Sequence, residues 1–428
     1  MLHVLIIGYV WPEPRSSAAG SRMMQLIHSF LDRGWRVTFA SAAQRSIHRA
    51  DLVALGIEEA DIALNCDSFN DQVRQWQPDM VVFDRFFTEE QFGWRVEAVC
   101  PDAIRVLDTE DLHCLRQARE LQLKQQLAAA PAGFPWYALP PDDALGSQER
   151  LLDLVSYSDT GLRELAAIYR CDLTLMISSA EMAFLQEYCG VPPDLLHYCP
   201  FLLEGDIVQG PAFEQRQDFV SIGNFRHQPN WDAVLCLKHS LWPAIRARLP
   251  KARLLVYGAY PPPKATALHN PREGFVVGGW VEDAATAMQA ARVCLAPLRF
   301  GAGLKGKLID AMQNGTPSVT TPTGAEGMHQ SLPWPGAIAT NNESFVEAAT
   351  ALYSNPAVWE QAHQQAQAVL QRVFPRETLL ASLQERLDRL LADIGQHRRR
   401  NLVGSMLRHH LHRSHQYMSQ WIAAKNRG

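Results

Sequence analysis

The chain of 428 residues lacks several features that mark secreted, membrane-spanning and nucleic-acid-binding proteins. Its eight cysteines form no Cys-x-x-Cys pair and are scattered through segments typical of strands and helices, so we expect them to be reduced and buried. No run reaches the roughly 18 apolar residues that a membrane-spanning helix needs, and the N-terminus has no basic leader or small-residue cleavage site. We therefore expect a cytoplasmic protein without a signal peptide, whose membrane contact is at most peripheral.

The sequence is also short of net charge. The formal net charge is only −5, whereas a dedicated nucleic-acid-binding protein is more often basic, so no nucleic-acid partner is predicted. Hydrophobic residues make up 47% of the chain and charged residues 20%, as in ordinary globular proteins. The length allows two or three domains.

The first 200 residues alternate buried strands with amphipathic helices. Residues 4–7 are a continuous apolar run ended by Gly8, and residues 23–31 place their apolar side chains at helical spacing. Further strands are predicted at residues 37–40, 80–83, 104–107 and 173–177. Ser178-x-x-Glu181 then predicts a capping box at the start of a helix. Alternation of this kind indicates a parallel sheet covered by helices.

The second half of the chain repeats this opening. The pattern lapses over residues 201–217 and restarts with a strand at residues 219–222, a glycine, a polar loop and a helix. Strands are expected at residues 254–257, 275–277, 293–296 and 318–320. We predict an α/β fold in which two Rossmann-like domains, residues 1–200 and 218–395, face a central cleft across a linker at 201–217.

Two segments fall outside this pattern. Residues 117–167 are helix-prone with a proline-rich centre (Pro131, Pro135, Pro140 and Pro141), which fits either part of a binding wall or a surface excursion. The tail at residues 396–428 contains six arginines, one lysine, five histidines and no acidic residue, and its Val403, Leu407 and Leu411 share a helical face. Such a tail fits either a basic amphipathic helix on an anionic membrane or a poorly ordered extension.

The most informative stretch runs from Arg299 to Met328, RFGAGLKGKLIDAMQNGTPSVTTPTGAEGM. A glycine-rich loop opens directly into a helix, an arrangement that offers backbone N–H groups and a helix N-terminus to an anion such as phosphate. Lys305 and Lys307 add positive charge, and Asp310 lies one turn into the helix, where its carboxylate can accept hydrogen bonds from sugar hydroxyls. The segment predicts a nucleotide-sugar pocket.

These motifs resemble those of the GT-B-fold group 1 glycosyltransferases (family 4), retaining enzymes that use nucleotide-sugar donors. The resemblance includes IIGYVWPEPRSSAAGSRMMQLIHSFLDRGWRVTFAS, RCDLTLMISSAEMAFL and SIGNFRHQPNWDAV, besides the glycine-rich segment. It implies that residues 1–200 form the acceptor domain and residues 218–395 the nucleotide-sugar donor domain.

The family motif Glu-x7-Glu aligns with Ala302 and Asp310. The resemblance implies that Asp310, a shorter carboxylate, binds the donor ribose. Ala302 replaces the glutamate that contacts the transferred sugar, so we infer that the glycine-rich loop takes over its contacts. The inferred donor-contacting residues of this loop are Gly301, Ala302, Gly303, Leu304 and Lys305.

The family also holds the donor diphosphate with a basic pair near the start of the second domain. Arg226 matches one member of the pair, and Lys305 is our candidate for the missing lysine. An arginine can grip a phosphate through two hydrogen bonds, while a lysine acts as a point charge. Together they would stabilise the charge that develops on the leaving diphosphate.

In the first domain the resemblance places Gly20, in a loop before a helix starting near Arg22, beside the leaving phosphate. Asp111 and His113 follow the strand ending at Asp108, and either could orient the acceptor hydroxyl or serve in binding alone. Structural roles are alternatives for each: a turn for Gly20, a core or capped histidine for His113, and a helix-dipole partner for Asp310.

We therefore expect a metal-independent, retaining glycosyltransferase that moves a hexose-type sugar from a nucleotide-diphosphate donor to a glycan, lipid-linked or other acceptor, with no cofactor. The chain contains no Asp-x-Asp, which argues against the metal-dependent GT-A type of enzyme. Two alternatives remain open. One is a non-catalytic GT-B scaffold in a glycan-assembly complex, suggested by Ala302, and the other is a GT-B sugar-nucleotide epimerase.

Overall fold

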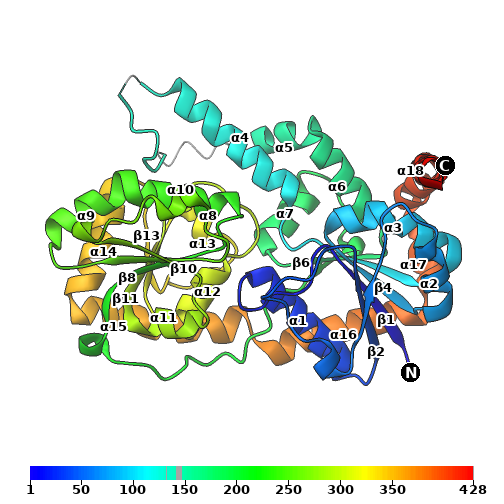
Figure 1. Cartoon of the computed structure of the whole chain (residues 1–428), viewed down its shortest axis with the longest axis horizontal. Coiled ribbons are helices and arrows are strands. Elements are labelled where there is room, and N and C mark those ends of the chain that lie inside the picture. The colour runs from blue at the N-terminus through cyan, green and yellow to red at the C-terminus, as the bar shows by residue number, and fades with distance from the viewer. Residues whose placement is uncertain (132, 141–146, 428) are drawn as a thin grey trace.

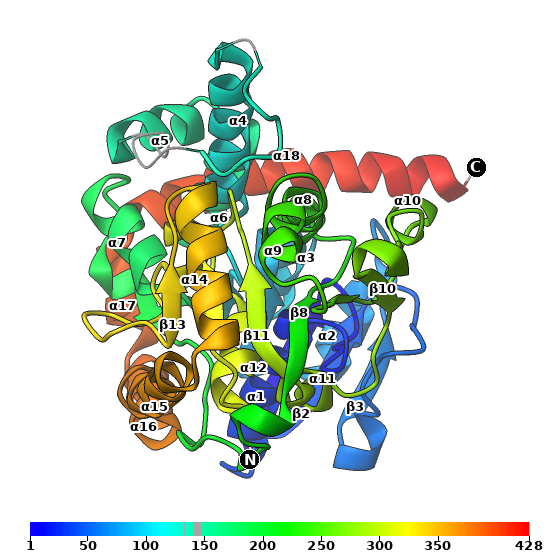
Figure 2. The same cartoon turned by 90° about the vertical axis from the view of Figure 1, so that its left-hand side faces the viewer.

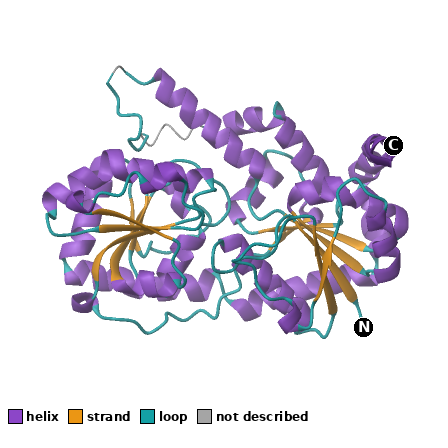
Figure 3. Ribbon diagram, in the orientation of Figure 1, coloured by secondary structure: helices purple, strands orange, loops and turns teal. Residues whose placement is uncertain are grey.

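The computed structural model describes residues 1–131, 133–140 and 147–427, without the side chains of residues 410–413 and 427. Pro141, the side chain of Leu411 and Gly428 therefore lie outside the described residues. The chain forms two α/β domains side by side, each with a central sheet (Figure 1). Helices cover both faces of each sheet, as the colouring by secondary structure shows (Figure 3).

The N-terminal domain is built from regularly alternating strands and helices. Its strands are β1 (His3–Gly8), β2 (Arg36–Ser41), β3 (Glu58–Asp61), β4 (Met80–Asp84), β5 (Ile104–Asp108), β6 (Leu173–Met176) and β7 (Leu196–Tyr198). Its helices are α1 (Ala18–Leu31), α2 (Ser68–Trp76), α3 (Arg85–Val99), α4 (His113–Ala129), α5 (Gln148–Ser156), α6 (Asp159–Arg170) and α7 (Ser179–Glu187).

The C-terminal domain repeats the scheme. Its strands are β8 (Gln217–Ile222), β9 (Leu254–Tyr257), β10 (Phe275–Gly279), β11 (Ala291–Ala296), β12 (Ser318–Thr320) and β13 (Gly336–Ile338). Its helices are α8 (Gln228–Cys236), α9 (Trp242–Arg248), α10 (Pro263–Thr266), α11 (Ala284–Ala290), α12 (Gly306–Gln313), α13 (Pro322–Ala325), α14 (Asn342–Ser354) and α15 (Pro356–Val373). The chain then continues through α16 (Arg376–Ala392), α17 (Ile394–Arg400) and α18 (Leu402–Arg427).

Both sheets are entirely parallel and have the same kind of topology. The strand order is β3-β2-β1-β4-β5-β6-β7 in the first domain and β10-β9-β8-β11-β12-β13 in the second. The order reverses between β1 and β4 and between β8 and β11. In open α/β sheets, ligands bind beyond the carboxyl ends of the strands at such a reversal. These two points therefore mark where a site is expected.

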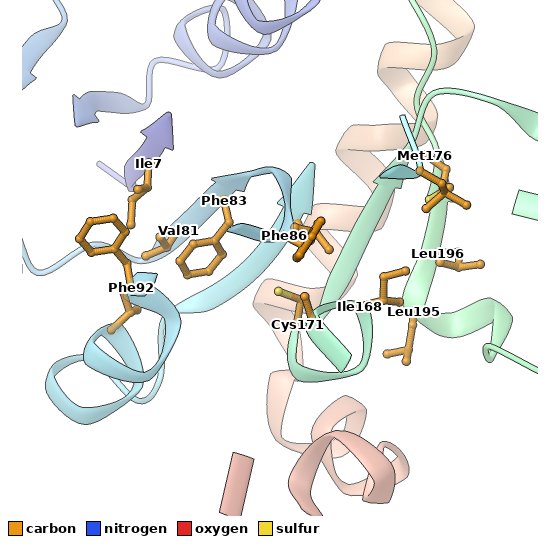
Figure 4. Packing of buried hydrophobic residues seen from close by; sticks show 14 of the residues in the cluster. Ile7, Val81, Phe83, Phe86, Phe92, Ile168, Cys171, Met176, Leu195 and Leu196 are labelled. Carbon is orange, nitrogen blue, oxygen red and sulfur yellow. The ribbon is translucent and has the colours of Figure 1, made fainter. Parts of the chain in front are cut away.

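Buried apolar side chains from both faces of the strands hold each domain together. In the first domain Ile7, Val81 and Phe83 on neighbouring strands pack with Phe86 and Phe92 of α3 (Figure 4). All residues of β1 and β4 are buried, which explains why these strands read as continuous apolar runs rather than alternating ones.

The sequence predicts the central strands correctly and misses β3, β7 and β13. β3 has the sequence EEAD and lies at the edge of its sheet, where a strand needs no apolar face. β7 and β13 are only three residues long. Their pairing depends on neighbours distant in the sequence, which local pattern does not reveal.

The helix α16 lies on the N-terminal domain, although the sequence analysis includes it in residues 218–395. Leu383, Leu387 and Leu390 pack into a core cluster together with Val4 and Ile6 of β1. The chain returns from the C-terminal to the N-terminal domain at Pro375, which pairs with Leu203. An amphipathic leucine stripe predicts burial, but it does not identify the domain that buries it.

The insertion forms a helical arm that touches the other domain. The long helix α4 extends above the domains (Figure 1). After it, the backbone N–H of Leu139 donates to Asn342 Oδ1 at 2.8 Å, and Arg299 donates to the carbonyl of Trp136 at 2.6 Å. The segment is thus an interdomain bridge rather than a free surface excursion.

Within the described part of the chain, no helix is both long and apolar enough to cross a membrane. The eight cysteines are all free thiols, and six of them are buried.

Candidate active site

The glycine-rich segment lies at the strand-order reversal of the C-terminal domain. It follows β11 and leads into α12, whose N-cap is Lys305. Gly303 has φ +63°, in the left-handed region that favours glycine. A Cβ at Gly303 would come within 2.8 Å of Asp111 Cβ in the other domain, so the absence of a side chain allows the two domains to meet here.

The N-termini of two helices converge at this point. A Cβ on Gly306, the first residue of α12, would lie 2.3 Å from the Cβ of Ala18, the first residue of α1. Helix N-termini carry partial positive charge and unpaired N–H groups, and both favour an anion. The two domains therefore bring their positive helix ends to a common place, which neither periodicity nor composition could reveal.

Gly20 lies inside the first turn of α1 rather than in the preceding loop. The helix begins at Ala18, and the Gly20 N–H donates to the N-cap Ser17 at 3.0 Å. A Cβ at Gly20 would lie 2.4 Å from the backbone of Glu13. The glycine thus allows residues 12–17 to pack tightly against the helix start, and a direct contact with phosphate stays a prediction.

Glu181 joins the two domains. Its Oε1 accepts hydrogen bonds from the N–H of Leu112 at 3.0 Å and of Gly303 at 2.7 Å, while Oε2 is buried without a partner. Burial, with a smaller effect of the nearby Asp111 charge, raises the pKa of Glu181 to about 8. The Gly303 N–H that the sequence analysis assigns to the donor is therefore occupied here by a glutamate. Ser178 caps Glu181 N as predicted, but the Glu181 carboxylate turns to Gly303 instead of completing a capping box.

The side chain of Lys305 folds back onto the glycine-rich loop. Its Nζ donates to the carbonyls of Ala302, at 3.2 Å, and Gly303. Burial lowers the pKa of Lys305, while the opposite charge of Glu326 acts against this shift. Lys305 is therefore a fixed, buried cation rather than a mobile one, and it stabilises the loop through the carbonyl oxygens. Ala302 and Leu304 are buried, and Leu304 packs in a cluster with Ile177 of the N-terminal domain.

Lys307 and Asp310 lie on α12 near the carboxyl end of β8. Lys307 Nζ donates to Asn230 Oδ1 at 2.7 Å and lies close to Gly223, the residue directly after β8. Burial lowers the pKa of Lys307 to about 8 and raises that of Asp310 to about 7. Asp310 is partly exposed as a residue, and contact of its carboxyl group with the donor ribose stays a prediction.

Arg226 is exposed in the loop after β8, and its guanidinium stacks 3.6 Å from the ring centroid of Tyr260. The Tyr260 hydroxyl donates to Glu13 Oε1 of the N-terminal domain at 2.9 Å. The indole N–H of Trp280 donates to the carbonyl of Arg15 at 3.3 Å. Arg226 therefore keeps an accessible guanidinium beside a second set of interdomain contacts.

Asp111 and His113 lie together at the start of α4. His113 Nδ1 is 3.2 Å from the carbonyl of Asp111, and the His113 N–H donates to Glu164 at 3.1 Å. Burial acts to raise the pKa of Asp111, but the charges of Arg116 and His113 outweigh it and hold that pKa below its usual range. Asp111 is thus ionised and paired with Arg116. The ring of His113 packs edge-on against Phe86 and Phe87, as a core histidine does.

A buried charge cluster lies at the carboxyl ends of β4 and β5. Arg22 donates to both carboxylate oxygens of Asp108 at 2.6 Å and to the carbonyl of Cys199 at 2.8 Å. Glu110 Oε1 is 3.7 Å from Arg22 and has no hydrogen-bond partner, and burial together with the charge of Asp108 raises the pKa of Glu110 well above its usual value. Glu110 therefore takes up a proton more readily than an isolated glutamate, beside the hydrogen-bonded Arg22–Asp108 pair.

Arg119 of α4 reaches the C-terminal domain. It donates to both carboxylate oxygens of Glu326 at 2.7 Å and to the carbonyl of Gly301 at 2.9 Å. Glu326 also lines an open cavity of about 460 Å³ between the domains. The other lining residues come from the start of α7, from α13 and the loop after it, and from β13: Ser179, Ala180, Pro322, Ala325, Gly327, His329, Gln330 and Ile338.

The structure thus gathers most of the predicted residues at one interdomain junction, and their roles there remain predictions. It adds Glu181 and Arg119, which the sequence analysis did not select. The sequence pattern marked Glu181 as a possible helix-capping residue. Its contact with the other domain, however, depends on tertiary structure. Arg119 has no local signal, since its partner Glu326 is more than 200 residues away.

Comparison with known proteins agrees with this arrangement. Residues 216–355 match the family model described as "Glycosyl transferases group 1". No curated protein matches the chain. Within the described residues, no three His, Cys, Asp or Glu side chains are grouped so that they could hold a metal ion.

Solved structures of similar fold span nearly the whole chain. A point mutant of Staphylococcus aureus TarM, solved with fondaparinux, alpha-GlcNAc-glycerol and UDP, has a TM-score of 0.65 at 7% identity, covering 90% of this chain and 99% of its own. Anabaena HepE, solved with UDP and glucose, has a TM-score of 0.62 at 14% identity, covering 91% and 100%. Sucrose-phosphate synthase from Thermosynechococcus elongatus has a TM-score of 0.61 at 14% identity, covering 92% and 100%. These likenesses establish the fold.

Proposed function

We propose that this chain, a group 1 glycosyltransferase with the GT-B fold, transfers a sugar from a nucleotide-diphosphate donor to a glycan or lipid-linked acceptor. The observation that carries this proposal is the convergence of the N-termini of α1 and α12 at the strand-order reversals of the two domains. Transfer releases a nucleoside diphosphate, and preorganised N–H dipoles stabilise the charge on that leaving group without the cost of reorienting solvent. The HepE structure with UDP and glucose and the TarM structure with UDP and a glycan support this choice of ligands.

The donor would lie along α12, with its diphosphate at the helix N-terminus and its ribose at Asp310. Arg226 is exposed and within the same domain, so it can grip a phosphate through two hydrogen bonds. Lys305 would support donor binding indirectly. Its ammonium group donates to carbonyls of the glycine-rich loop, and this leaves the loop's N–H groups free to point toward the donor. The Gly303 N–H becomes available to the donor only when Glu181 releases it.

Asp111 and His113 would contribute the acceptor side. Asp111 is ionised and can accept a hydrogen bond from the acceptor hydroxyl, while His113 holds the turn by its contacts with Asp111 and Glu164. We propose that the reaction retains the anomeric configuration and needs no resident metal or cofactor. Retention follows the family resemblance, and the absence of an Asp-x-Asp sequence supports metal independence. The free, mostly buried cysteines favour a reducing compartment such as the cytoplasm.

Isothermal titration with UDP, GDP and ADP tests donor recognition. We expect at least one nucleoside diphosphate to bind, and the Lys305→Ala variant to bind it roughly ten-fold more weakly or worse, because the loop loses its internal cation. Lys251→Ala, which removes an exposed lysine from the N-terminal side of β9, is the matched control. Binding of none of the three nucleotides by the wild type would contradict the proposal.

Nuclear magnetic resonance of nucleotide sugars then separates the possible reactions. Glycosyl transfer requires an acceptor and releases nucleoside diphosphate, and the anomeric signal of the product reports retention directly. Conversion of one donor sugar into another without acceptor would instead identify an epimerase. Addition of a chelator should leave the transfer rate unchanged, and a lost rate restored by a divalent cation would overturn metal independence.

A further inference from the structure

The C-terminal helix α18 is a structured surface element that the active site does not use. It is 26 residues long and packs on α6 and α3 of the N-terminal domain. In the view of Figure 2 it runs across the molecule, and its C-terminal end projects beyond the neighbouring elements. The helix is therefore part of the folded domain along one side and open along another.

Specific contacts fix the inner side of α18. A Cβ on Gly404 would lie 2.1 Å from the carbonyl oxygen of Tyr169, so the helix backbone approaches α6 very closely. Arg408 donates to the carbonyl of Arg170 at 3.2 Å and lies 3.4 Å from Glu97. Near the other end, Arg95 donates to Ser419 Oγ at 3.0 Å. These contacts determine which side of the helix faces solvent.

The outer side carries a stripe of exposed apolar side chains, which we call the α18 stripe. Its members are 48% to 69% exposed: Leu402, Val403, Met406, Tyr417, Met418 and Trp421. Val403 and Trp421 are five helical turns apart and Met406 and Tyr417 about three, so each pair lies on the same side of the helix. The stripe thus has two apolar groups, one at residues 402–406 and one at residues 417–421, and a folded protein rarely leaves such groups of large apolar side chains in water without a partner.

The charged residues of α18 and of the preceding helix α17 are all positive. Arg399 and Arg400 are exposed on α17 immediately before α18, and Lys425 Nζ lies 5.4 Å from the ring centroid of Trp421. The sequence has no acidic residue from position 394 to its last residue. Two copies of such a helix would repel one another, whereas an anionic surface would attract it.

We propose that the α18 stripe and its flanking cations dock the protein on an anionic lipid bilayer. The helix would lie in the plane of the interface, with its apolar side chains among the acyl chains and its arginines and lysine at the headgroups. Tyr417 and Trp421 suit this position because each combines a large apolar body with a polar group that stays hydrated. The proposal does not depend on glycosyl transfer.

Vesicle flotation with the full chain tests this docking. The vesicles contain phosphatidylcholine alone or phosphatidylcholine with phosphatidylglycerol. We expect binding only to the second kind, weakened by added salt. Replacing Tyr417, Met418 and Trp421 together by serine should reduce the bound fraction at least about ten-fold, since most of the inserted area is lost. Tyr157→Ser removes an aromatic side chain that is 89% exposed outside the stripe and should have no effect.

Charge variants test the electrostatic part. The double variant Arg399→Gln/Arg400→Gln should weaken binding to the anionic vesicles several-fold. A double variant of exposed cations in the other domain, Lys251→Gln/Arg272→Gln, should not. Nucleotide titration on each variant confirms that the fold and the donor site are intact, so loss of docking is distinguishable from loss of the proposed catalytic function.

Any of three results would overturn the proposal. The first is that the wild type binds neither kind of vesicle, and the second is that the serine triple variant binds as well as the wild type. The third is a concentration-dependent dimer in light scattering that the triple variant abolishes without any vesicle binding, because the stripe would then be covered by a second copy of the chain.

Discussion

The two domains share one topology but carry opposite chemistry at the point where their strand order reverses. In the N-terminal domain the ends of β4 and β5 bear a buried charge cluster, in which Arg22 pairs with Asp108 beside Glu110, whose pKa is raised by burial. In the C-terminal domain the end of β11 bears glycines and a helix N-terminus, with a lysine that donates to the loop's own carbonyls.

This contrast shows that two domains of the same topology can offer different kinds of binding surface. A buried ion pair with its hydrogen bonds satisfied fixes a rigid surface, whereas N–H groups at a helix start offer an incomplete site that an anion completes. Under the proposed function, the N-terminal domain would position the acceptor, and the C-terminal domain would hold the negatively charged donor. The following predictions test this division, beginning with the largest expected effect.

Breaking the charge cluster should damage the N-terminal domain most. Arg22→Met leaves Asp108 buried without its partner, so we expect a loss of about 3–5 kcal/mol in the free energy of unfolding. The control is Arg253→Met, which breaks an ion pair with Asp218 in the other domain whose arginine is largely exposed; its cost should be below about 1 kcal/mol. Urea unfolding measures both. Equal losses would mean that burial does not distinguish the two pairs.

Adding one methyl group at the junction should disable the site. Gly303→Ala places a Cβ against Asp111 of the opposite domain, so we expect kcat/KM for transfer to fall at least about 100-fold through misplacement of reacting groups. Gly34→Ala is a matched control, because Gly34 has φ +67° but no atom within 4 Å of the added Cβ. Both variants carry the strain of a left-handed alanine, and only Gly303→Ala has the clash. Similar activity losses in the two would attribute the effect to strain alone.

Glu181 should make stability depend on pH. Its pKa is about 8 in the folded protein, against a reference value of 4.5, so the folded state binds a proton more readily than the unfolded state. This contribution to stability is fully present below about pH 4.5 and is lost as the pH rises toward 8.

Glu181→Gln should therefore flatten the fall in stability between pH 5 and 8, which this group makes on the order of 1 kcal/mol per pH unit. Thermal melts across that range measure it. Parallel pH curves for the wild type and Glu181→Gln would show that Glu181 does not titrate there.

The smallest effect is expected at the Arg119–Glu326 pair, which is partly exposed and lies between the domains. Arg119→Gln should raise the donor KM about five-fold, near 1 kcal/mol. The contact between the two domains loses one ion pair, while the local structure of each domain is kept. The exchange Arg119→Glu/Glu326→Arg should restore part of the loss. Steady-state kinetics measure the donor KM and kcat of each variant. A change in kcat with unaltered KM would mean that the pair acts in a step after donor binding.

Much of the fold could be predicted from the sequence because its central strands are continuous apolar runs followed by glycine or aspartate. A close approach at the segment after β11 was also predictable, since three glycines beside two lysines weaken a helix start unless a close approach requires them, and the other domain makes that approach at Gly303 and Gly306. The edge strand β3 could not be predicted, because its EEAD sequence carries no apolar signal.

The sequence by itself determined the alternation of strands and helices, the division into two like domains, the glycine-rich loop that leads into a helix, and the basic C-terminal helix. Only the tertiary structure decided that Glu181 occupies the Gly303 N–H, that α16 packs on the first domain, and which side of α18 faces solvent. The physical reason is the sequence separation of the residues that interact. Periodicity and helix starts follow from neighbours within a few residues, whereas a contact across the junction depends on how two separately folded surfaces meet.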